Sequence, residues 1–409
     1  MTIVQSNLPG KLLFQRANSF KRLKRFLNVL PILLVVVSIS ACVTTTGQMA
    51  ALPHTVENLR FIGEQRIPLK HTYEGTVVGG LSGLDYDPRS GNWILESDDR
   101  SDVNAARFYT AKLDYDQYKF SSVTLTGVNF FKQEDGSVYP NIEQHAAHKK
   151  GMVPDIESIR FDPLDSTVWY ASEGNRKLDM HPFVRHAQAN GSYLSTLPTP
   201  AMFNVSSKVE IGSRNNLTFE GLSFSPDGKT IWLGMEAPLY QDGEVATTTK
   251  GAYSRITQLD RQGKILGQFA YPLDSIPVAP AKGKLADNGL AELLAINDHQ
   301  LFAIERSGSQ DNAGVFHFYI RIYEIDVDGA TDVADVTALK ATSFKPVKKR
   351  LIVNLNSLKE LKVVDNIEGI AWGHKLANGH DSIVLVSDDN FSDTQVTQFL
   401  AFEVLPKTR

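Results

Sequence analysis

The chain has 409 residues, of which 42% are hydrophobic and 22% are charged. This composition is that of a globular protein and excludes an intrinsically disordered chain. Residues 1–42 hold six basic residues and no acidic residue, so the remainder carries 42 − 6 = 36 basic against 46 acidic residues, a formal charge of −10. Because nucleic-acid-binding domains concentrate positive charge, this balance argues against nucleic acid as a partner and favours cations.

The chain begins with a segment typical of exported proteins. A basic stretch precedes the apolar run VLPILLVVVSIS and then small residues, which is the order of a secretory signal peptide. The run is shorter than the roughly 20 apolar residues of a membrane span. Cys42, the only cysteine of the sequence, ends the stretch ISAC. That stretch resembles the lipobox of bacterial lipoproteins, in which the signal is cleaved before a cysteine that carries lipid on its thiol. The alternative is an uncleaved membrane anchor with an incidental cysteine.

These features divide the chain into three parts. We predict a lipoprotein signal peptide at 1–41, a lipidated Cys42 with a flexible tether at 42–57, and a folded domain at 58–409. The residue after Cys42 is Val43 and not an aspartate, which by resemblance to lipoproteins of diderm bacteria favours the outer membrane. We therefore expect a monomer in the cell envelope, on the periplasmic face of the outer membrane or on the cell surface, that meets the membrane only through its lipid.

The rest of the chain repeats one pattern five times. Each copy has a polar entry, a short apolar strand, a turn rich in Asp, Pro, Gly or Asn, a second apolar strand and an acidic exit. The copies are LSGLDYDPRSGNWILESDDR (81–100), DIESIRFDPLDSTVWYASEGNR (155–176), TFEGLSFSPDGKTIWLGMEAP (218–238), GLAELLAINDHQLFAIERSG (289–308) and NIEGIAWGHKLANGHDSIVLVSDDNF (366–391). Further strand-like runs lie between them, such as YSRITQLDRQGKILGQFAY.

Four antiparallel strands per repeat predict an all-β fold, a single β-propeller of four-stranded blades. Five copies of the pattern predict five blades, and the sequence leaves open whether residues 125–155 form a sixth. The last copy is followed by only one more strand, TQFLAFEVL (397–405), so we expect NLRFIGEQRIPL (58–69) to supply the outer strand of the last blade. A pair of stacked β-sandwiches is the alternative fold.

Acidic residues recur where the predicted inner strands begin and where the second strands end, with Ser82 at the first of these places in the first repeat. An unpaired buried carboxylate costs on the order of several kcal/mol. We therefore expect these groups to converge on one mouth of the propeller channel, where cations or arginines compensate them. The predicted metal ligands are Asp98, Asp99, Asp155, Glu157, Glu173, Glu220, Glu292, Glu305, Glu368 and Asp388.

In combination and in this order, these strings resemble the phytase-like family, described as "esterase-like activity of phytase", over about residues 75–405. The most telling strings are GLSGLDYDPRSGNWILESDDR, PDIESIRF, RNNLTFEGLSFSPDG, NGLAELLAI and DNIEGIAWG. The resemblance implies hydrolysis of phosphate or carboxylic esters. Similarity in fold to the calcium-dependent propeller phytases is an analogy, because function depends on the site.

The residues favour a cation-dependent hydrolase of phosphate esters. Oxygen ligands without cysteine suit calcium first and magnesium second. The predicted catalytic residues are Glu220, Glu368, Arg100, Arg176 and Arg306, and the predicted substrate-binding residues are Asn216, Asn288, Asn366 and Asn390.

Other interpretations stay open. The arginines and carboxylates can instead form ion pairs that join neighbouring blades. A propeller can also be a non-enzymatic binding module on the envelope surface. A carboxylic esterase is a further alternative, although no G-x-S-x-G motif surrounds Ser82.

Overall fold

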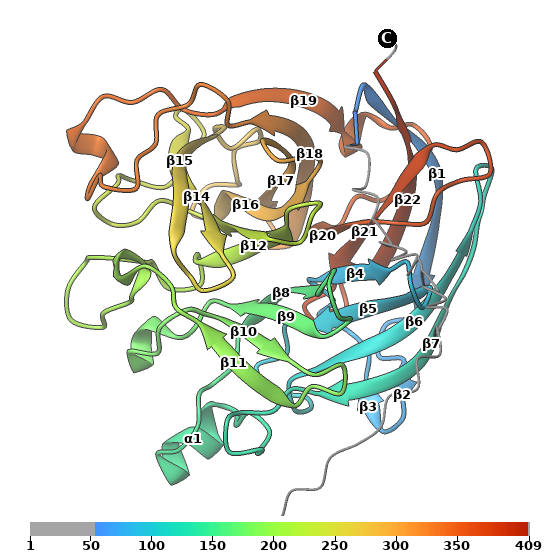
Figure 1. The fold of residues 1–409 in the computed structure, drawn as a ribbon, viewed down its shortest axis with the longest axis horizontal. Coiled ribbons are helices and arrows are strands. Elements are labelled where there is room, and N and C mark those ends of the chain that lie inside the picture. The colour runs from blue at the N-terminus through green and yellow to red at the C-terminus, as the bar shows by residue number, and fades with distance from the viewer. Residues whose placement is uncertain (1–53, 408–409) are drawn as a thin grey trace, which may run out of the picture. The chain divides into compact units, whose positions relative to one another are not determined.

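The computed structural model describes residues 54–407 of the chain. The predicted signal peptide, Cys42 and the tether up to residue 53 lie outside the described residues. Within them, five four-stranded antiparallel sheets surround a common centre as the blades of a β-propeller (Figure 1). The prediction of a single all-β propeller is confirmed. The blade number is five, and the stacked-sandwich alternative does not hold.

The strands of each blade follow one another from the centre outward. The first blade comprises β4 (Leu84–Asp87), β5 (Asn92–Ser97), β6 (Arg107–Tyr115) and β7 (Phe120–Phe130), and the second comprises β8 (Ile156–Phe161), β9 (Val168–Ser172), β10 (Phe183–Ala187) and β11 (Tyr193–Leu197). The third blade comprises β12 (Phe219–Phe224), β13 (Thr230–Met235), β14 (Ala252–Asp260) and β15 (Ile265–Leu273), and the fourth comprises β16 (Ala286–Ala295), β17 (Gln300–Gln310), β18 (Phe316–Asp326) and β19 (Lys348–Asn354). The fifth blade comprises β20 (Asn366–Trp372), β21 (Asp381–Asp388), β22 (Thr397–Leu405) and the N-terminal strand β1 (Asn58–Ile67).

Other described elements are short. A two-stranded hairpin, β2 (Thr72–Tyr73) and β3 (Thr76–Val77), precedes the first blade, and the helix α1 (Ile142–His148) lies in the stretch 125–155 where a sixth blade was left open. Four 3-10 turns complete the set: Arg176–Leu178, Ala201–Phe203, Leu339–Ala341 and Leu355–Ser357. None of the described helices has the length and apolar character needed to cross a membrane.

The turns that join inner to second strands follow from their sequences. In SPDG the amide of Gly228 donates to the Ser225 carbonyl at 2.8 Å, and the Ser225 hydroxyl accepts from the Thr230 amide at 3.0 Å. Gly228 has φ +70°, and a Cβ there would lie 2.7 Å from Pro163 Cγ. The turn therefore requires glycine for its backbone conformation and for its close packing.

The apolar core is divided among the gaps between blades. Five large clusters of buried side chains each draw on two neighbouring blades, as when Phe302 and Ile304 of β17 pack with Ile370 of β20 and Leu385 of β21. Alternate residues of each strand face one neighbour and then the other, which explains strands that are apolar on both faces.

The N-terminal strand closes the ring. β1 pairs antiparallel with β22 from Asn58 opposite Leu405 to Ile67 opposite Thr397, and Figure 1 shows these two strands side by side. The predicted mixed last blade is confirmed. It leaves β22 without a free edge, which would otherwise invite pairing with another chain.

Replacing Leu59 with alanine should weaken this closure. The side chain is buried in the cluster shared by the last two blades, so we expect a loss of about 2–5 kcal/mol in the free energy of unfolding. Urea denaturation measures the loss. Leu285→Ala is the matched control, because Leu285 is 66% exposed and should change stability by less than about 0.5 kcal/mol. Equal effects of the two substitutions would contradict a stabilising role for β1.

Arg160 of β8 spans the central channel. Its guanidinium donates to the carbonyls of Leu84 on β4, Leu222 on β12 and Leu293 on β16, at 2.5, 2.6 and 3.1 Å. It also forms an ion pair of 2.8 Å with Glu292, and both side chains are buried. One arginine therefore joins four of the five inner strands and occupies the axis between them.

Candidate functional site: an acidic cavity at the channel mouth

A cavity of about 510 Å³ opens where the inner strands begin. We call it the acidic cavity, because carboxylates outnumber the two arginines in its lining. The acidic residues that line it are Asp98, Glu157, Glu220, Glu236, Asp287, Glu368 and Asp388. Arg100, Arg306 and the predicted substrate-binding residues Asn216, Asn366 and Asn390 line it as well. The expectation that groups far apart in the sequence meet around one axis is met by these residues.

Three of the glutamates reach the cavity through β-bulges. The strand register shifts across Glu157 in β8, across Glu220 in β12 and across Glu368 in β20. A bulge places an extra residue opposite a single partner and redirects its side chain. Equivalent strands thus direct an equivalent carboxylate into the same space.

The fourth inner strand breaks this pattern, and the predicted placement of Glu292 at the mouth is wrong. In β16 the register shifts across Ala291, so Glu292 stands one position further along the strand. Its carboxylate accepts hydrogen bonds from the Ser158 hydroxyl at 2.7 Å and the Leu222 amide at 2.8 Å, in addition to its ion pair with Arg160. Glu292 therefore belongs to the structure of the channel axis.

A second ring forms at the ends of the second strands. Asp388 faces Asn366 across the sheet, and Arg306 faces Gly289 in the same way. At the corresponding places the amides of Asp98, Glu173 and Glu236 donate at 2.8 Å to Gly80, Asp155 and Thr218. The ring thus holds four carboxylates and one arginine, and the arginine comes from one of the two blades without a bulged glutamate.

Two groups of carboxylates are arranged closely enough to hold a metal ion. Asp155, Glu157 and Glu173 form one group, and Glu173, Glu220 and Glu236 form the other, with one oxygen of each residue within 4.8 Å of the others. All five are buried. Glu173 belongs to both groups, and its Oε2 is buried without a hydrogen-bond partner. That unpartnered oxygen and the purely carboxylate donor set fit a hard divalent cation.

Burial makes these carboxylates reluctant to ionise. Desolvation raises the pKa of Glu236 to about 8, and the positive charge of Arg306 opposes this rise. Desolvation, with repulsion from neighbouring carboxylates, raises the pKa values of Glu157, Glu173 and Glu220 well above their usual range. A cation between them would supply the missing positive charge and favour the ionised forms.

Two arginines divide the acidic cavity between them. Arg306 lies 3.0 Å from Glu236, 3.1 Å from Asp287 and 3.4 Å from Glu368, measured between guanidinium nitrogens and carboxylate oxygens. Arg100 donates to the carboxylate of Asp155 and to the side-chain oxygen of Asn216. Each arginine thus pairs with one member of a carboxylate group, Arg306 with Glu236 and Arg100 with Asp155. Glu173, the member that the two groups share, forms no ion pair with either arginine.

Glu368 lies in neither carboxylate group. Its carboxylate accepts from the Ser82 hydroxyl at 3.1 Å and from the Asn366 amide group at 3.0 Å. Desolvation raises its pKa, and Arg306 opposes this. The lining of the cavity contains no histidine, so Ser82 lacks the base that a serine esterase would use.

Two of the predicted site residues are held away from the cavity by other contacts. Asp99 forms a buried ion pair of 2.6 Å with Arg107 and accepts from the backbone amides of residues 102–104. Arg176 donates to the Val209 carbonyl at 2.6 Å and lies over the ring of Tyr240 at 4.6 Å. Both residues stabilise loops outside the cavity lining.

Glu305 and Asn288 are also outside the cavity lining. Glu305 precedes Arg306, so its side chain points to the other face of β17, where it accepts from the Tyr271 hydroxyl at 2.9 Å and pairs with Lys349. The side-chain amide of Asn288 donates to Glu305 at 3.1 Å. These contacts join two blades, which is the structural alternative considered for the acidic residues.

Several lining residues were not chosen from the sequence. Glu236 directly follows the second strand of a repeat and was recognisable by that position, and Asp287 is the second residue of the inner strand β16. Leu217 directly precedes the third copy of the repeat. The others come from β18 and from the segment after β21, which the repeat does not cover, and are Phe316, Phe318, Ser392 and Gln395.

Comparison with known proteins identifies the family. The model of the phytase-like family, "esterase-like activity of phytase", matches residues 76–391, well over half of the chain. The chain belongs to the phytase-like family. Membership of this phytase-like family supports a hydrolase in general, without specifying the ester. No protein with a curated function matches the chain significantly.

Solved structures resemble this member of the phytase-like family only distantly. The catalytic domain of an α-L-arabinofuranosidase from Coprinopsis cinerea is 8% identical, with 86% of this chain and 98% of that chain covered and a TM-score of 0.38. A fructofuranosidase from Schwanniomyces occidentalis is 10% identical, with 85% and 58% covered and a TM-score of 0.37. A protein of unknown function from Dyadobacter fermentans is 11% identical, with 86% and 100% covered and a TM-score of 0.35. These scores are too low to bear on function.

Proposed function

We propose that this protein is a cation-dependent hydrolase of phosphate esters that acts in the acidic cavity. The observation that carries the proposal is the pair of carboxylate groups joined by Glu173, whose Oε2 is buried and unpartnered. Such a donor set is costly to maintain in a folded protein unless a cation compensates it. Calcium is the first candidate and magnesium the second, because calcium accepts many carboxylate oxygens.

The cation would be held by Asp155, Glu157 and Glu173, by Glu173, Glu220 and Glu236, or by both groups. When bound, it would supply positive charge and Lewis acidity for the phosphate group. Arg306 and Arg100 present further guanidinium groups to the same cavity, where they can bind phosphate oxygens. The side chains of Asn216, Asn366 and Asn390 can hydrogen-bond the remaining polar atoms of the substrate.

Glu368 is suited to act as the general acid that protonates the leaving alcohol. Burial raises the pKa of Glu368, which favours the protonated form that can give its proton to a leaving alkoxide. In the reaction, a water oxygen bonds to phosphorus while the bond between phosphorus and the ester oxygen breaks. The alcohol leaves with the proton of Glu368, and the attacking water returns a proton to Glu368. The hydrogen bonds from Ser82 and Asn366 hold the carboxyl group in place.

The cellular setting extends this proposal. We place the enzyme in the cell envelope, anchored through lipid on Cys42 as a monomer, with a small phosphate ester as its partner. We infer that setting from the basic and apolar N-terminal segment that ends at Cys42.

Turnover with and without calcium tests the function. We expect the purified protein to hydrolyse phosphate monoesters with calcium and to lose that activity with a chelator. Glu368→Gln should lower kcat by about 100-fold, the lower part of the range for a lost general acid, and leave calcium binding intact. Glu210→Gln, at an exposed loop position, should change neither quantity. Activity that survives the chelator would refute the cation dependence, and failure to cleave any phosphate ester would refute the function.

A further inference from the structure

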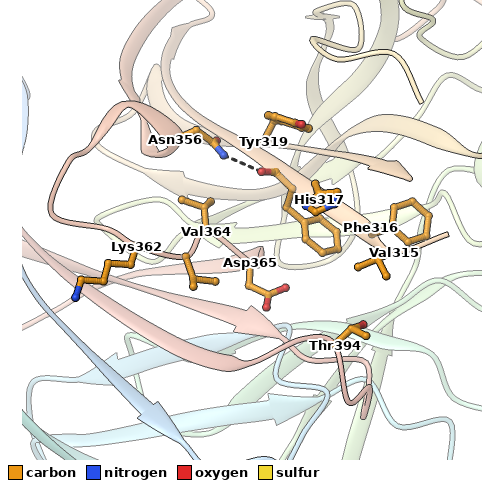
Figure 2. Close-up of a pocket in the computed structure, with 11 residues that line it drawn as sticks. Val315, Phe316, His317, Tyr319, Asn356, Lys362, Val364, Asp365 and Thr394 are labelled. Atoms are coloured by element: carbon orange, nitrogen blue, oxygen red, sulfur yellow. Dashed lines mark hydrogen bonds between the residues drawn. The ribbon is translucent and has the colours of Figure 1, made fainter. Parts of the chain in front are cut away.

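A second hollow lies beside the acidic cavity. This groove of about 410 Å³ is formed by the beginning of β18, around Val315–Tyr319, by residues 362–365 ahead of β20, and by Thr394. Figure 2 shows Phe316 and Val364 on opposing segments, with Lys362 at the end of the drawn set away from Phe316. The wall combines apolar side chains, those of Val315, Phe316, Phe318, Val363 and Val364, with polar ones, mainly those of His317, Asn356, Lys362 and Asp365.

The groove and the acidic cavity share walls. Phe316 and Phe318 line both, and their rings stack with centroids 6.0 Å apart. The neighbouring residues Asp365 and Asn366 line the groove and the cavity respectively, and so do Thr394 and Gln395. A molecule whose reacting group lies in the acidic cavity therefore has the groove beside it.

The groove is kept open by contacts that the fold provides. Pairing of β18 with β19 stops at Arg321 opposite Asn354. Beyond that point the side chain of Asn356 accepts from the Ile320 amide at 3.0 Å and donates to the Phe318 carbonyl at 2.8 Å, in place of a further strand residue. The hollow thus lies where an outer strand would otherwise continue.

The charge of the groove limits what can occupy it. The Asp365 carboxylate is engaged by the backbone amides of Asn366 and Val396, both at 2.8 Å. His317 is paired with Asp311 at 3.2 Å. Among the lining residues that leaves Lys362, at an exposed position, as the one cationic side chain without an ion-pair partner. A leaving group that carries several phosphates would need several arginines or lysines, which this wall does not provide.

We propose that the groove binds the organic part of the ester, and that the preferred substrates are monoesters of alcohols with an apolar or aromatic group. This inference rests on the proposed function of the acidic cavity. Glu368 lines the cavity together with Phe316 and Phe318, so the proposed proton donor shares the cavity with the two phenyl rings that also line the groove. The groove then contributes binding energy through apolar burial, and the cavity contributes the chemistry.

Methyl phosphate and benzyl phosphate test the inference, because both release a primary alcohol and differ mainly in the apolar group. We expect the calcium-loaded protein to show a kcat/KM about tenfold higher for benzyl phosphate, the size expected when part of a phenyl ring leaves water. Val363→Glu, which puts a charge into the groove, should remove this preference and leave the kcat/KM for methyl phosphate within about twofold. Val363 is 39% exposed, so the substitution is compatible with folding.

Val278→Glu is the matched control. Val278 is 40% exposed and lines neither hollow, so both substrates should behave as with the unaltered chain. Equal kcat/KM for the two substrates, or an equal loss for both in Val363→Glu, would overturn the groove inference while leaving the hydrolase proposal standing. If neither ester is cleaved, the hydrolase proposal fails, and calorimetry with methylphosphonate and benzylphosphonate then decides on the groove. Tighter binding of benzylphosphonate that Val363→Glu abolishes would support it, and equal or absent binding would overturn it.

Discussion

Glu173→Gln should remove both calcium-dependent turnover and calcium-dependent stabilisation. Glu173 is the residue common to the two carboxylate groups, so one substitution alters both of them, and each group includes at least one residue that lines the acidic cavity. Glutamine keeps an oxygen that can accept from the Thr218 amide, as Glu173 Oε1 does. The substitution therefore changes charge and ligand strength with little change in shape. We expect activity to fall at least about 100-fold, in line with the loss of a metal-ligating group.

Thermal unfolding separates this effect from simple damage. For the unaltered chain, calcium at 100 times its Kd should stabilise the fold by about 2.7 kcal/mol, a rise of several degrees in Tm. Glu173→Gln should lose that rise. In chelator its Tm should equal or exceed that of the unaltered chain, because a carboxylate among repelling carboxylates has been removed. Glu210→Gln should retain the full response to calcium. A Tm that drops in chelator and still rises with calcium would contradict the cation site.

Arg160→Met should be the most destabilising substitution that leaves the acidic cavity lining untouched. It removes hydrogen bonds to three inner strands and leaves Glu292 buried without its ion-pair partner. Breaking one side of a buried pair costs about 3–5 kcal/mol, because the other charge stays uncompensated. Urea denaturation measures this loss through the denaturation midpoint.

A second substitution distinguishes the charge from the packing. The double variant Arg160→Met with Glu292→Leu should recover part of the loss, since it removes the orphaned carboxylate. Arg66→Met is the exposed control, because Arg66 pairs with Glu64 at the surface and should cost less than about 1 kcal/mol. If the double variant is less stable than Arg160→Met by the full cost of a second core substitution, the uncompensated charge of Glu292 is not the cause of the loss in stability.

Much of the fold could be predicted because strands and turns depend on local sequence patterns. Alternation of apolar residues and turns such as SPDG indicates strands and hairpins wherever they occur, and the fivefold recurrence adds their arrangement. The closure by β1 was predictable from a simple deficit, since the last repeat contains three strands and needs a fourth. These inferences depend on features that short stretches of sequence carry by themselves.

The site was harder to predict because one residue of register decides where a side chain points. GLAELLA offers an alanine and a glutamate side by side, and either alignment keeps the apolar pattern acceptable. The bulge at Ala291 turns Glu292 toward Arg160 and brings Arg306 to the place of a carboxylate. Nothing local to the repeat records where a bulge forms, because the choice depends on packing against the adjacent inner strands. Phe316 and Phe318 were missed for a different reason, since they lie on a third strand whose neighbours in space are far away in sequence.

The arginine across the channel axis has a consequence for how the enzyme would work in its setting. Because Arg160 bonds to four of the five inner strands, it obstructs a straight path along the channel, so the product would leave by the mouth through which the substrate enters. Inorganic phosphate would bind the same cation and guanidinium groups as the ester and would compete with it for the cavity. Turnover would therefore slow as inorganic phosphate accumulates, without any separate regulatory site.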